Sequence, residues 1–580
     1  MRAGLMVSCI CGMAVSANAD LPASMDRAPK DALITITIGN IERCFNDIDA
    51  VGGPLGFSVQ DLGLPINIFE LNGLNRQGAL TLAAIAPPDF DPTMDEPTFI
   101  AIAPVTDFNA FITGLGGEAG EIATFTLEFQ ELFAKNLGGG YAAISENEEA
   151  LRAFTGAAGN LAAHRTAVGP TGLAVAESSD IFMTINLPSM RPMIEQGLAG
   201  MREQFELMAM MTGQEMNAPL AFFEGMANAL KTDGQSMVMG LDGGEHGMSF
   251  GLSTQFNPES PTARYFAAEG NAGNLLGKLP AGNPFLAVVA MDFSSPGVQT
   301  MLKELAKASQ AMAQQQGGMF GGMNLEQMVT MAQGQAFILG KPPALGGGML
   351  FNNTLAFYPT NDPAAYQNMA RQALASMNGQ TVEGMTTSTI YNPGVATIAG
   401  TKVDEWAVRM KFDPNNPDAL QVQQIMAFIF GLSGGPTGYS AAVPGGVITT
   451  LAKNSALMET AIAATKGQGP TLANDASIRP IAARLPAGRV IEGYIGTHAV
   501  IELALELGAM VGGFFDVELP PSIAPIGMGL TARQGGMQVG IVVPMDAIKA
   551  FKQISDQVNA GMGEDFDGAD APPPPPPGRF

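Results

Sequence analysis

The sequence predicts an α+β protein with two homologous halves, each a mixed, largely antiparallel sheet with amphipathic helices packed on one face. Three observations predict this fold class. A strand, a tight break and an amphipathic helix form a unit that recurs along the chain, the units occur in the same order twice, and each pass closes on a β-hairpin. We expect the two halves to span residues 25–275 and 276–558.

Segment 98–114, with the sequence TFIAIAPVTDFNAFITG, shows the unit most clearly. Its first part is a continuous apolar run, typical of a buried strand, and Pro104 ends that run. Thr106 or Asp107 can cap the helix that follows. Apolar residues then recur at positions i, i+3, i+4 and i+7, which places them on one helical face. The segment therefore predicts a strand followed directly by an amphipathic helix.

The units form two passes of the same order. The first pass has units that begin at Leu33, Thr98, Gly140 and Ile181, and a hairpin that turns at Gly243 and Gly244. The second pass has units that begin at Phe285, Thr354, Gly446 and Val490, and a hairpin that turns at Gly535 and Gly536. The second half also carries an insertion at about 380–440. Because strand-helix units support parallel pairing by crossover whereas hairpins are antiparallel, we expect mixed sheets.

Three segments place a proline just before a strand-helix unit: PKDALITITIGNIE, LPAGNPFLAVVAMDFSS and LPAGRVIEGYIGTHAV. With these segments the chain resembles a group of exported bacterial proteins of unknown function that are built from repeated Pro-strand-helix units. The resemblance implies an architecture and brings no catalytic residues to this chain.

The N-terminal end of the chain predicts an exported protein, periplasmic or extracellular, and the C-terminal end predicts a disordered tail. Residues 1–19 have the features of a signal peptide: Arg2, an apolar run too short to span a bilayer, and small residues at Ala17 and Ala19. Residues 559–580 are acidic and include six consecutive prolines, which is typical of a disordered tail. Removal of the signal leaves Cys44 as the one remaining cysteine, so we expect no intramolecular disulfide.

The composition argues against several classes of function. Acidic residues number 54 against 29 basic ones, and the net charge of −25 repels nucleic acid. Beyond the signal, no run of about 18 apolar residues occurs, so we expect no integral membrane segment in the mature chain. The three histidines lack the spacing of metal ligands, and the glycine-rich segments lack a complete phosphate-binding motif. We therefore expect no metal site and no cofactor.

One pattern suggests catalysis as an alternative. The segment GLSGG places Ser433 in a G-x-S-x-G motif, and Asp475 and His498 follow in the chain order of a serine-hydrolase triad. Such a nucleophile needs a helix directly after the serine, but two prolines and several glycines follow Ser433. We interpret the match as chance in a glycine-rich chain.

Clustered methionines are the most distinctive feature among the 36 in the chain. Thioethers fill helix cores, line adaptable apolar grooves, or bind copper(I). The spacing of Met201 and Met208 fits core packing. The candidate groove residues are Met208, Met210, Met211, Met216, Met319 and Met323.

Taken together, these patterns predict an exported, non-enzymatic scaffold or binding protein whose partner is an unknown protein or an apolar ligand. A serine hydrolase that uses Ser433, Asp475 and His498 is one alternative, and a periplasmic copper-handling protein that uses the methionine clusters is another. The repeated units bring no titratable side chains together in a pattern typical of an active site. This favours the scaffold over the two alternatives.

Overall fold

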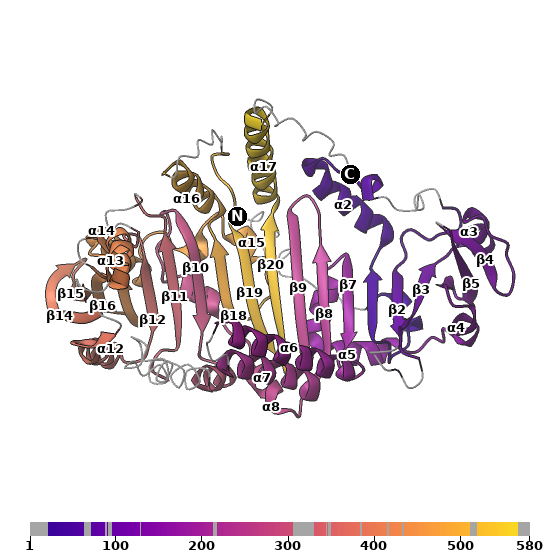
Figure 1. Ribbon diagram of the computed structural model, residues 1–580, viewed down its shortest axis with the longest axis horizontal. Coiled ribbons are helices and arrows are strands. Elements are labelled where there is room, and N and C mark those ends of the chain that lie inside the picture. Colours follow the sequence, from indigo (N-terminus) through magenta and orange to yellow (C-terminus); the bar gives the residue numbers. More distant parts are fainter. Residues whose placement is uncertain are drawn as a thin grey trace, which may run out of the picture.

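The computed structural model describes residues 21–62, 71–87, 90, 95–127, 129–212, 217–304, 330–343, 345, 350–382, 385–413, 417–431, 434–510 and 519–566. The predicted signal peptide therefore lies outside the described residues. Within the described part of the chain, twenty strands form one sheet that runs the length of the molecule (Figure 1).

Nine strands belong to the first half of the chain: β1 (Ile34–Ile38), β2 (Leu80–Ile85), β3 (Thr98–Pro104), β4 (Ala123–Leu127), β5 (Gln130–Gly138), β6 (Tyr141–Ser145), β7 (Ile181–Asn186), β8 (Gly234–Asp242) and β9 (Gly247–Phe256). The longer helices of this half are α2 (Ile41–Leu55), α3 (Phe108–Gly114), α4 (Glu148–Ala153), α5 (Leu161–Glu177), α6 (Arg191–Thr212) and α7 (Asn217–Asp233). Short helices are η1 (Ala23–Arg27), η2 (Val59–Leu62), α8 (Pro261–Tyr265) and α9 (Ala272–Leu276).

The second half contributes β10 (Phe285–Asp292), β11 (Gly334–Gly340), β12 (Leu355–Pro359), β13 (Thr381–Val382), β14 (Met385–Ile398), β15 (Thr401–Phe412), β16 (Thr437–Val443), β17 (Gly446–Thr450), β18 (Arg489–Ile495), β19 (Ile526–Arg533) and β20 (Gly536–Pro544). Its helices are α12 (Pro363–Met377), α13 (Pro417–Phe430), α14 (Ser455–Thr465), η5 (Leu472–Asn474), α15 (Arg479–Ala482), α16 (Thr497–Met510) and α17 (Met545–Phe566). Residues 296–304 are also helical.

The strands follow the same order outward from the middle of the sheet in both directions. From the centre, the first half runs β9, β8, β7, β1, β2, β3, β6, β5, β4. The second half runs β20, β19, β18, β10, β11, β12, β17, β16, β15, and then β14 and β13. The extra elements β13, β14 and α13 fall within the predicted insertion at about 380–440.

The prediction of a separate, mixed sheet in each half is wrong. Strands β9 and β20 pair along their whole length, with Gly251 opposite Gly540 at the centre, so the halves share one sheet. Every strand pairing among the described residues is antiparallel. A strand-helix unit predicts a crossover to a parallel strand, but the next strand in each half pairs as an antiparallel neighbour.

Helices pack on both faces of the sheet, which corrects the prediction that they lie on one. Successive side chains of a strand point to opposite faces. Phe182 of β7 packs with Val175 of α5 on what we call the covered face. Its neighbour Ile181 pairs with Ile38 of β1, which packs against Phe45 of α2 on the opposite face. We call this second face the open face, because helices cover it only around its margins.

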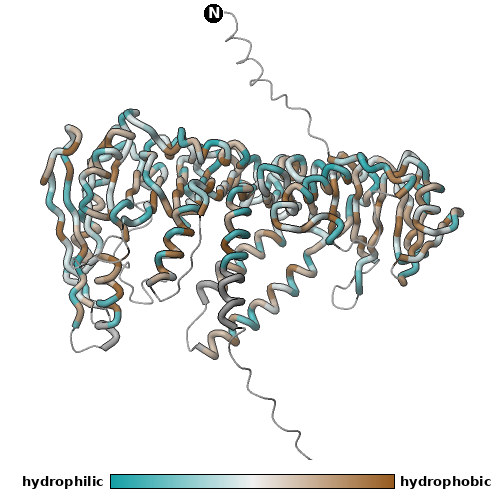
Figure 2. Tube along the Cα trace, turned by 90° about the horizontal axis from the view of Figure 1, so that it is seen from above, coloured by the Kyte–Doolittle hydropathy of each residue, from teal (hydrophilic) through white to brown (hydrophobic). Residues whose placement is uncertain are grey.

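The two faces differ in how completely they are packed. On the covered face α9 and α14 enclose a large core over the strands of the second half, which includes Leu276, Leu355, Phe357, Met458 and Tyr494. Seen along the sheet, α6, α7, α16 and α17 extend from one side of it (Figure 2). Helices α16 and α17 pack on Ile526 and Val543, which identifies this side as the open face.

The start of α3 and the end of α17 bear on two local predictions. The side chain of Asp107 accepts a hydrogen bond from the N–H of Ala110, 3.0 Å away, so Asp107 caps α3 as predicted. The predicted start of the C-terminal tail at residue 559 is too early, because α17 continues to Phe566. The rest of the tail lies outside the described residues.

Candidate functional site

An apolar strip crosses the middle of the open face. Strand register aligns one row of side chains from β1 to β19: Ile36, Met183, Met239, Leu252, Val539 and Leu530. A second row lies one step along the strands: Ile181, Leu241, Phe250, Ile541 and Met528. We call these eleven residues the apolar strip. None of them is charged, and six strands at the usual spacing make the strip about 25 Å long.

The side chains of the strip are incompletely buried. Ile36 and Leu241 are each 40% exposed and Met528 is 43% exposed, and the remaining eight are half-buried. Scattered apolar residues are ordinary on protein surfaces, but a continuous apolar row that spans six strands is not.

Helices border the strip along both of its long sides. Along one side, α2 packs on Ile38, and α16 and α17 pack on Ile526 and Val543. Along the other side, α7 contacts β8, and Leu302 of the 296–304 helix packs close to Leu530. Figure 1 shows the central strands between these two groups of helices.

A small apolar cavity adjoins the strip beneath α2. Its volume is about 170 Å³, and its lining includes Cys44, Val51 and Phe57 on the α2 side and Leu241 and Met248 on the sheet side. Burial raises the pKa of the Cys44 thiol to about 12, and the charges of Asp180 and Asp47 act in the same direction. The thiol is therefore neutral at physiological pH.

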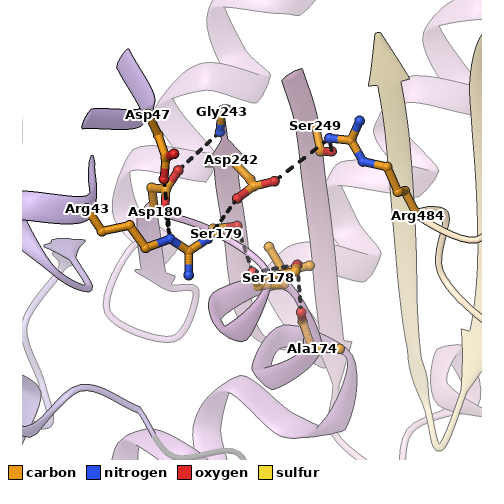
Figure 3. A network of polar contacts seen from close by, with 11 residues as sticks. Arg43, Asp47, Ala174, Ser178, Ser179, Asp180, Asp242, Gly243, Ser249 and Arg484 are labelled. Carbon is orange, nitrogen blue, oxygen red and sulfur yellow. Dashed lines mark hydrogen bonds and ion pairs between the residues drawn. The ribbon is translucent and has the colours of Figure 1, made fainter. Parts of the chain in front are cut away.

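A network of charged residues lies at the polar end of this cavity (Figure 3). The Nε of Arg43 on α2 lies 3.1 Å from Asp180 and 3.3 Å from Asp47, and its Nη2 lies 3.3 Å from Asp242. Arg484, from the second half of the chain, lies 3.9 Å from Asp242. The network therefore fixes α2 on the ends of β7 and β8 and links the two halves.

Arg484 makes two further contacts with the β8–β9 hairpin. One Nη donates to the carbonyl of His246 at 2.9 Å, and the other donates to the hydroxyl of Ser249 at 2.7 Å. His246 thus takes part through its main chain, consistent with its place in a turn.

Two of the three acidic partners of Arg43, Asp180 and Asp242, have raised pKa values, which give a pH prediction. Burial raises the pKa of Asp180 and of Asp242, although Arg43 opposes the shift at both. A carboxyl whose pKa is higher in the folded protein favours folding most at low pH, and this contribution is lost as the pH rises through the folded-state pKa. On acidification from pH 7 toward 4.5, we expect the free energy of unfolding to rise more, or to fall less, in the wild type than in Asp180→Asn/Asp242→Asn.

Urea unfolding at several pH values measures this difference. The general effect of the net charge is common to both proteins and cancels in the comparison. The same pH dependence in the two proteins would contradict the assignment.

The predicted methionine site is only partly described. Met208, Met210 and Met211 lie near the C-terminal end of α6, where they are 46%, 74% and 87% exposed. The core interpretation is therefore wrong for Met208, and Met201 is only half-buried. Met216, Met319 and Met323 lie outside the described residues. The three described groove candidates are on α6, which packs against α7, and are not part of the strip.

The residues of the alternative triad are not brought together in the described part of the chain. The carboxylate of Asp475 accepts hydrogen bonds from the N–H and hydroxyl of Ser477, at 2.9 and 2.6 Å. The Nε2 of His498 lies 3.3 Å from Glu502, which in turn pairs with Lys341. Ser433 lies outside the described residues. Neither described member of the triad thus contacts the other.

The part of the chain that the structure describes contains no metal-ligand cluster and no helix that could span a membrane. Among the described residues, no group of three or more His, Cys, Asp or Glu side chains is placed to hold a metal ion. In the same part of the chain, no helix combines the length and apolarity needed to cross a bilayer.

Sequence reasoning missed the apolar strip, although its signal was present. The segment ITITI of β1 alternates perfectly, and such a pattern usually buries the isoleucines. Here Thr35 and Thr37 are buried, and their hydroxyls bond to Thr184 and Thr81. The isoleucines therefore face the open side. The Met-Gly-Leu sequence shared by the two hairpins, at 239–241 and 528–530, was a second signal for equivalent surface positions.

Comparisons with known proteins add little to this geometry. No protein-family model matches the chain, and no curated protein matches it. A solved structure described as crystal form III of TP0453 is 6% identical, with 48% of this chain and 97% of that chain covered. Its TM-score is 0.21, too low to support an argument about fold or function.

Proposed function

We propose that this chain is an exported, non-enzymatic binding scaffold that arose by duplication and holds an elongated, uncharged apolar ligand on the apolar strip. The observation that carries the proposal is the uninterrupted row of partly exposed apolar side chains across the β9–β20 seam. Large exposed apolar patches of this kind generally mark binding sites.

The identical strand order of the two halves supports duplication. So does a row of four glycines on the covered face, formed by Gly240, Gly251, Gly540 and Gly529 on adjacent strands. A Cβ atom at Gly240 would lie 2.0 Å from the Oγ of Ser179, and one at Gly540 would lie 2.5 Å from the Cδ of Pro486. Both halves thus use glycine at matching positions to admit a segment packed closely on the sheet.

The chemistry of the strip supports the choice of ligand. Its side chains carry no charge, so a charged group placed on it would lose hydration without gaining a partner. The net charge of −25 disfavours anionic ligands and anionic membrane surfaces. Helices border both long sides of the strip, so an elongated molecule can lie along it between them. Export rests on the signal peptide predicted from residues 1–19.

Saturable binding of Nile red, a neutral apolar dye, tests the proposed function. We expect the wild type to bind it and Met239→Gln/Met528→Gln to bind it at least tenfold more weakly. When a ligand covers the exposed part of each methionine, the burial of that surface contributes about 1 kcal/mol to binding. Loss of both contributions exceeds the 1.4 kcal/mol that corresponds to a factor of ten in affinity.

Two further variants locate the dye. Ile425 and Phe428 are 52% and 42% exposed on α13, far from the strip in Figure 1, so Ile425→Gln/Phe428→Gln is a matched control that should retain binding. Met210→Gln/Met211→Gln tests the exposed end of α6 and should also retain most of it. Loss of binding only in one of these two variants, or no saturable binding by the wild type, would refute the proposed site.

A further inference from the structure

We propose that the cavity beneath α2 is a subsite for an uncharged hydrocarbon or aryl group about the size of benzene, which forms one end of the elongated ligand. This inference rests on the proposed function for the rest of the ligand, but the subsite can be tested by itself. Three features of the cavity carry it: its volume, its lining and its position.

The volume and lining determine the chemical class of the occupant. An apolar cavity of about 150 Å³ in a protein core stays free of water and binds benzene. The cavity under α2, at about 170 Å³, is of that size. Its wall consists mainly of apolar side chains, including Ile48, Val51 and Leu55 from α2. A polar or charged occupant would therefore lack partners for its hydrogen bonds.

The charged groups at the end of the cavity are already engaged. Asp47 and Asp180 line that end, and both bind Arg43. Asp180 also accepts a hydrogen bond from the N–H of Gly243 at 3.1 Å. These contacts occupy the carboxylates and hold α2 in place as the roof. The network thus shapes the cavity without supplying a charge for a ligand to bind.

The position of the cavity connects it to the apolar strip. Ile181 and Leu241 belong to both the strip and the cavity wall, and Leu241 is 40% exposed. Phe57, at 38% exposed, lies on the opposite wall and also reaches the surface. An apolar group can therefore enter between Leu241 and Phe57 while the rest of the molecule lies along the second row of the strip.

Toluene, which is neutral and of suitable size, is the probe for this subsite. We expect saturable binding by the full-length protein, with a shift of the Met248 methyl signal in spectra of methyl-labelled methionine, assigned with Met248→Leu. In Val51→Phe the added ring fills part of the cavity, and toluene affinity should fall at least tenfold. Val51→Ile adds one methylene and should retain binding.

The outcomes separate the subsite from the proposed function. A wild type that does not bind toluene saturably, or a folded Val51→Phe that binds it normally, overturns the subsite. Thermal unfolding without ligand checks that Val51→Phe is folded; if it is not, Leu55→Phe fills the cavity from the other side and replaces it. Nile red binding that depends on Met239 and Met528 tests the proposed function independently of the subsite, because neither methionine lines the cavity.

Discussion

Replacement of Arg489 by methionine is expected to destabilise the protein by about 3–5 kcal/mol, the usual cost of removing one partner of a buried ion pair. The Nε of Arg489 lies 2.7 Å from the carboxylate of Glu492, which is 1% exposed. Tyr494 donates a hydrogen bond to the same carboxylate at 2.5 Å. Arg489 also donates to the carbonyl of Pro486 at 2.8 Å. The variant would leave a carboxylate buried with one hydrogen bond and loosen the segment before β18.

A double variant distinguishes the ion pair from general packing. In Arg489→Met/Glu492→Leu no charge is left buried, so most of the lost stability should return. The midpoint and slope of urea unfolding measure the effect, and an unchanged slope shows that the unfolding reaction is comparable. A loss below about 1 kcal/mol in the single variant would show that the pair is already solvated, contrary to its burial.

Valine at either of two glycines of the row, Gly240 on β8 and Gly540 on β20, is expected to cost about 2–3 kcal/mol. Their strands lie against Ser179 and Pro486, and any side chain there must displace these residues. Overpacking of this kind usually costs about 1–3 kcal/mol, and the near contacts put these positions at the upper end.

Gly200 provides the matched control for the glycine row. It lies in the middle of α6, where an added Cβ would have no neighbour within 4 Å and no proline follows, so Gly200→Ala should leave stability unchanged or raise it by up to about 1 kcal/mol. Losses at both Gly240 and Gly540 would agree with a close approach over the glycine row in each half. A neutral effect at either would show that the close approach is not required there.

The sequence allowed the elements and their order to be predicted because both depend on local signals. The unit at Thr98 becomes β3 and α3, and the unit at Val490 becomes β18 and α16. The two glycine-containing hairpins become β8–β9 and β19–β20. Apolar periodicity, caps and turns determine such features over a few residues.

Pairing and burial could not be predicted, because they depend on contacts between distant segments. Nothing in the two hairpins themselves indicates that β9 pairs with β20, so the single sheet was missed. The burial pattern of β1 is the reverse of the usual one, because the hydroxyls of Thr35 and Thr37 form hydrogen bonds with hydroxyls on β7 and β2. Without those partners, burial of the isoleucines would be the better choice.

The candidate site was missed for the same reason. The apolar strip collects one or two side chains from each of six strands, and no segment contains enough of them to stand out. The methionine clusters stand out in the sequence, yet Met210 and Met211 lie on α6 and not in the strip. The apolar groove was therefore predicted at residues that lie outside the strip.

The most direct test of the central claim is the position of a bound neutral ligand, measured by methyl spectra of methionine at saturating Nile red. The account predicts that the signals of Met239 and Met528 shift together with the same affinity, because the ligand crosses the β9–β20 seam. The signal of Met369, a buried residue of α12, should stay unchanged. Shifts confined to Met210 and Met211, with Met239 and Met528 unaffected, would contradict the account.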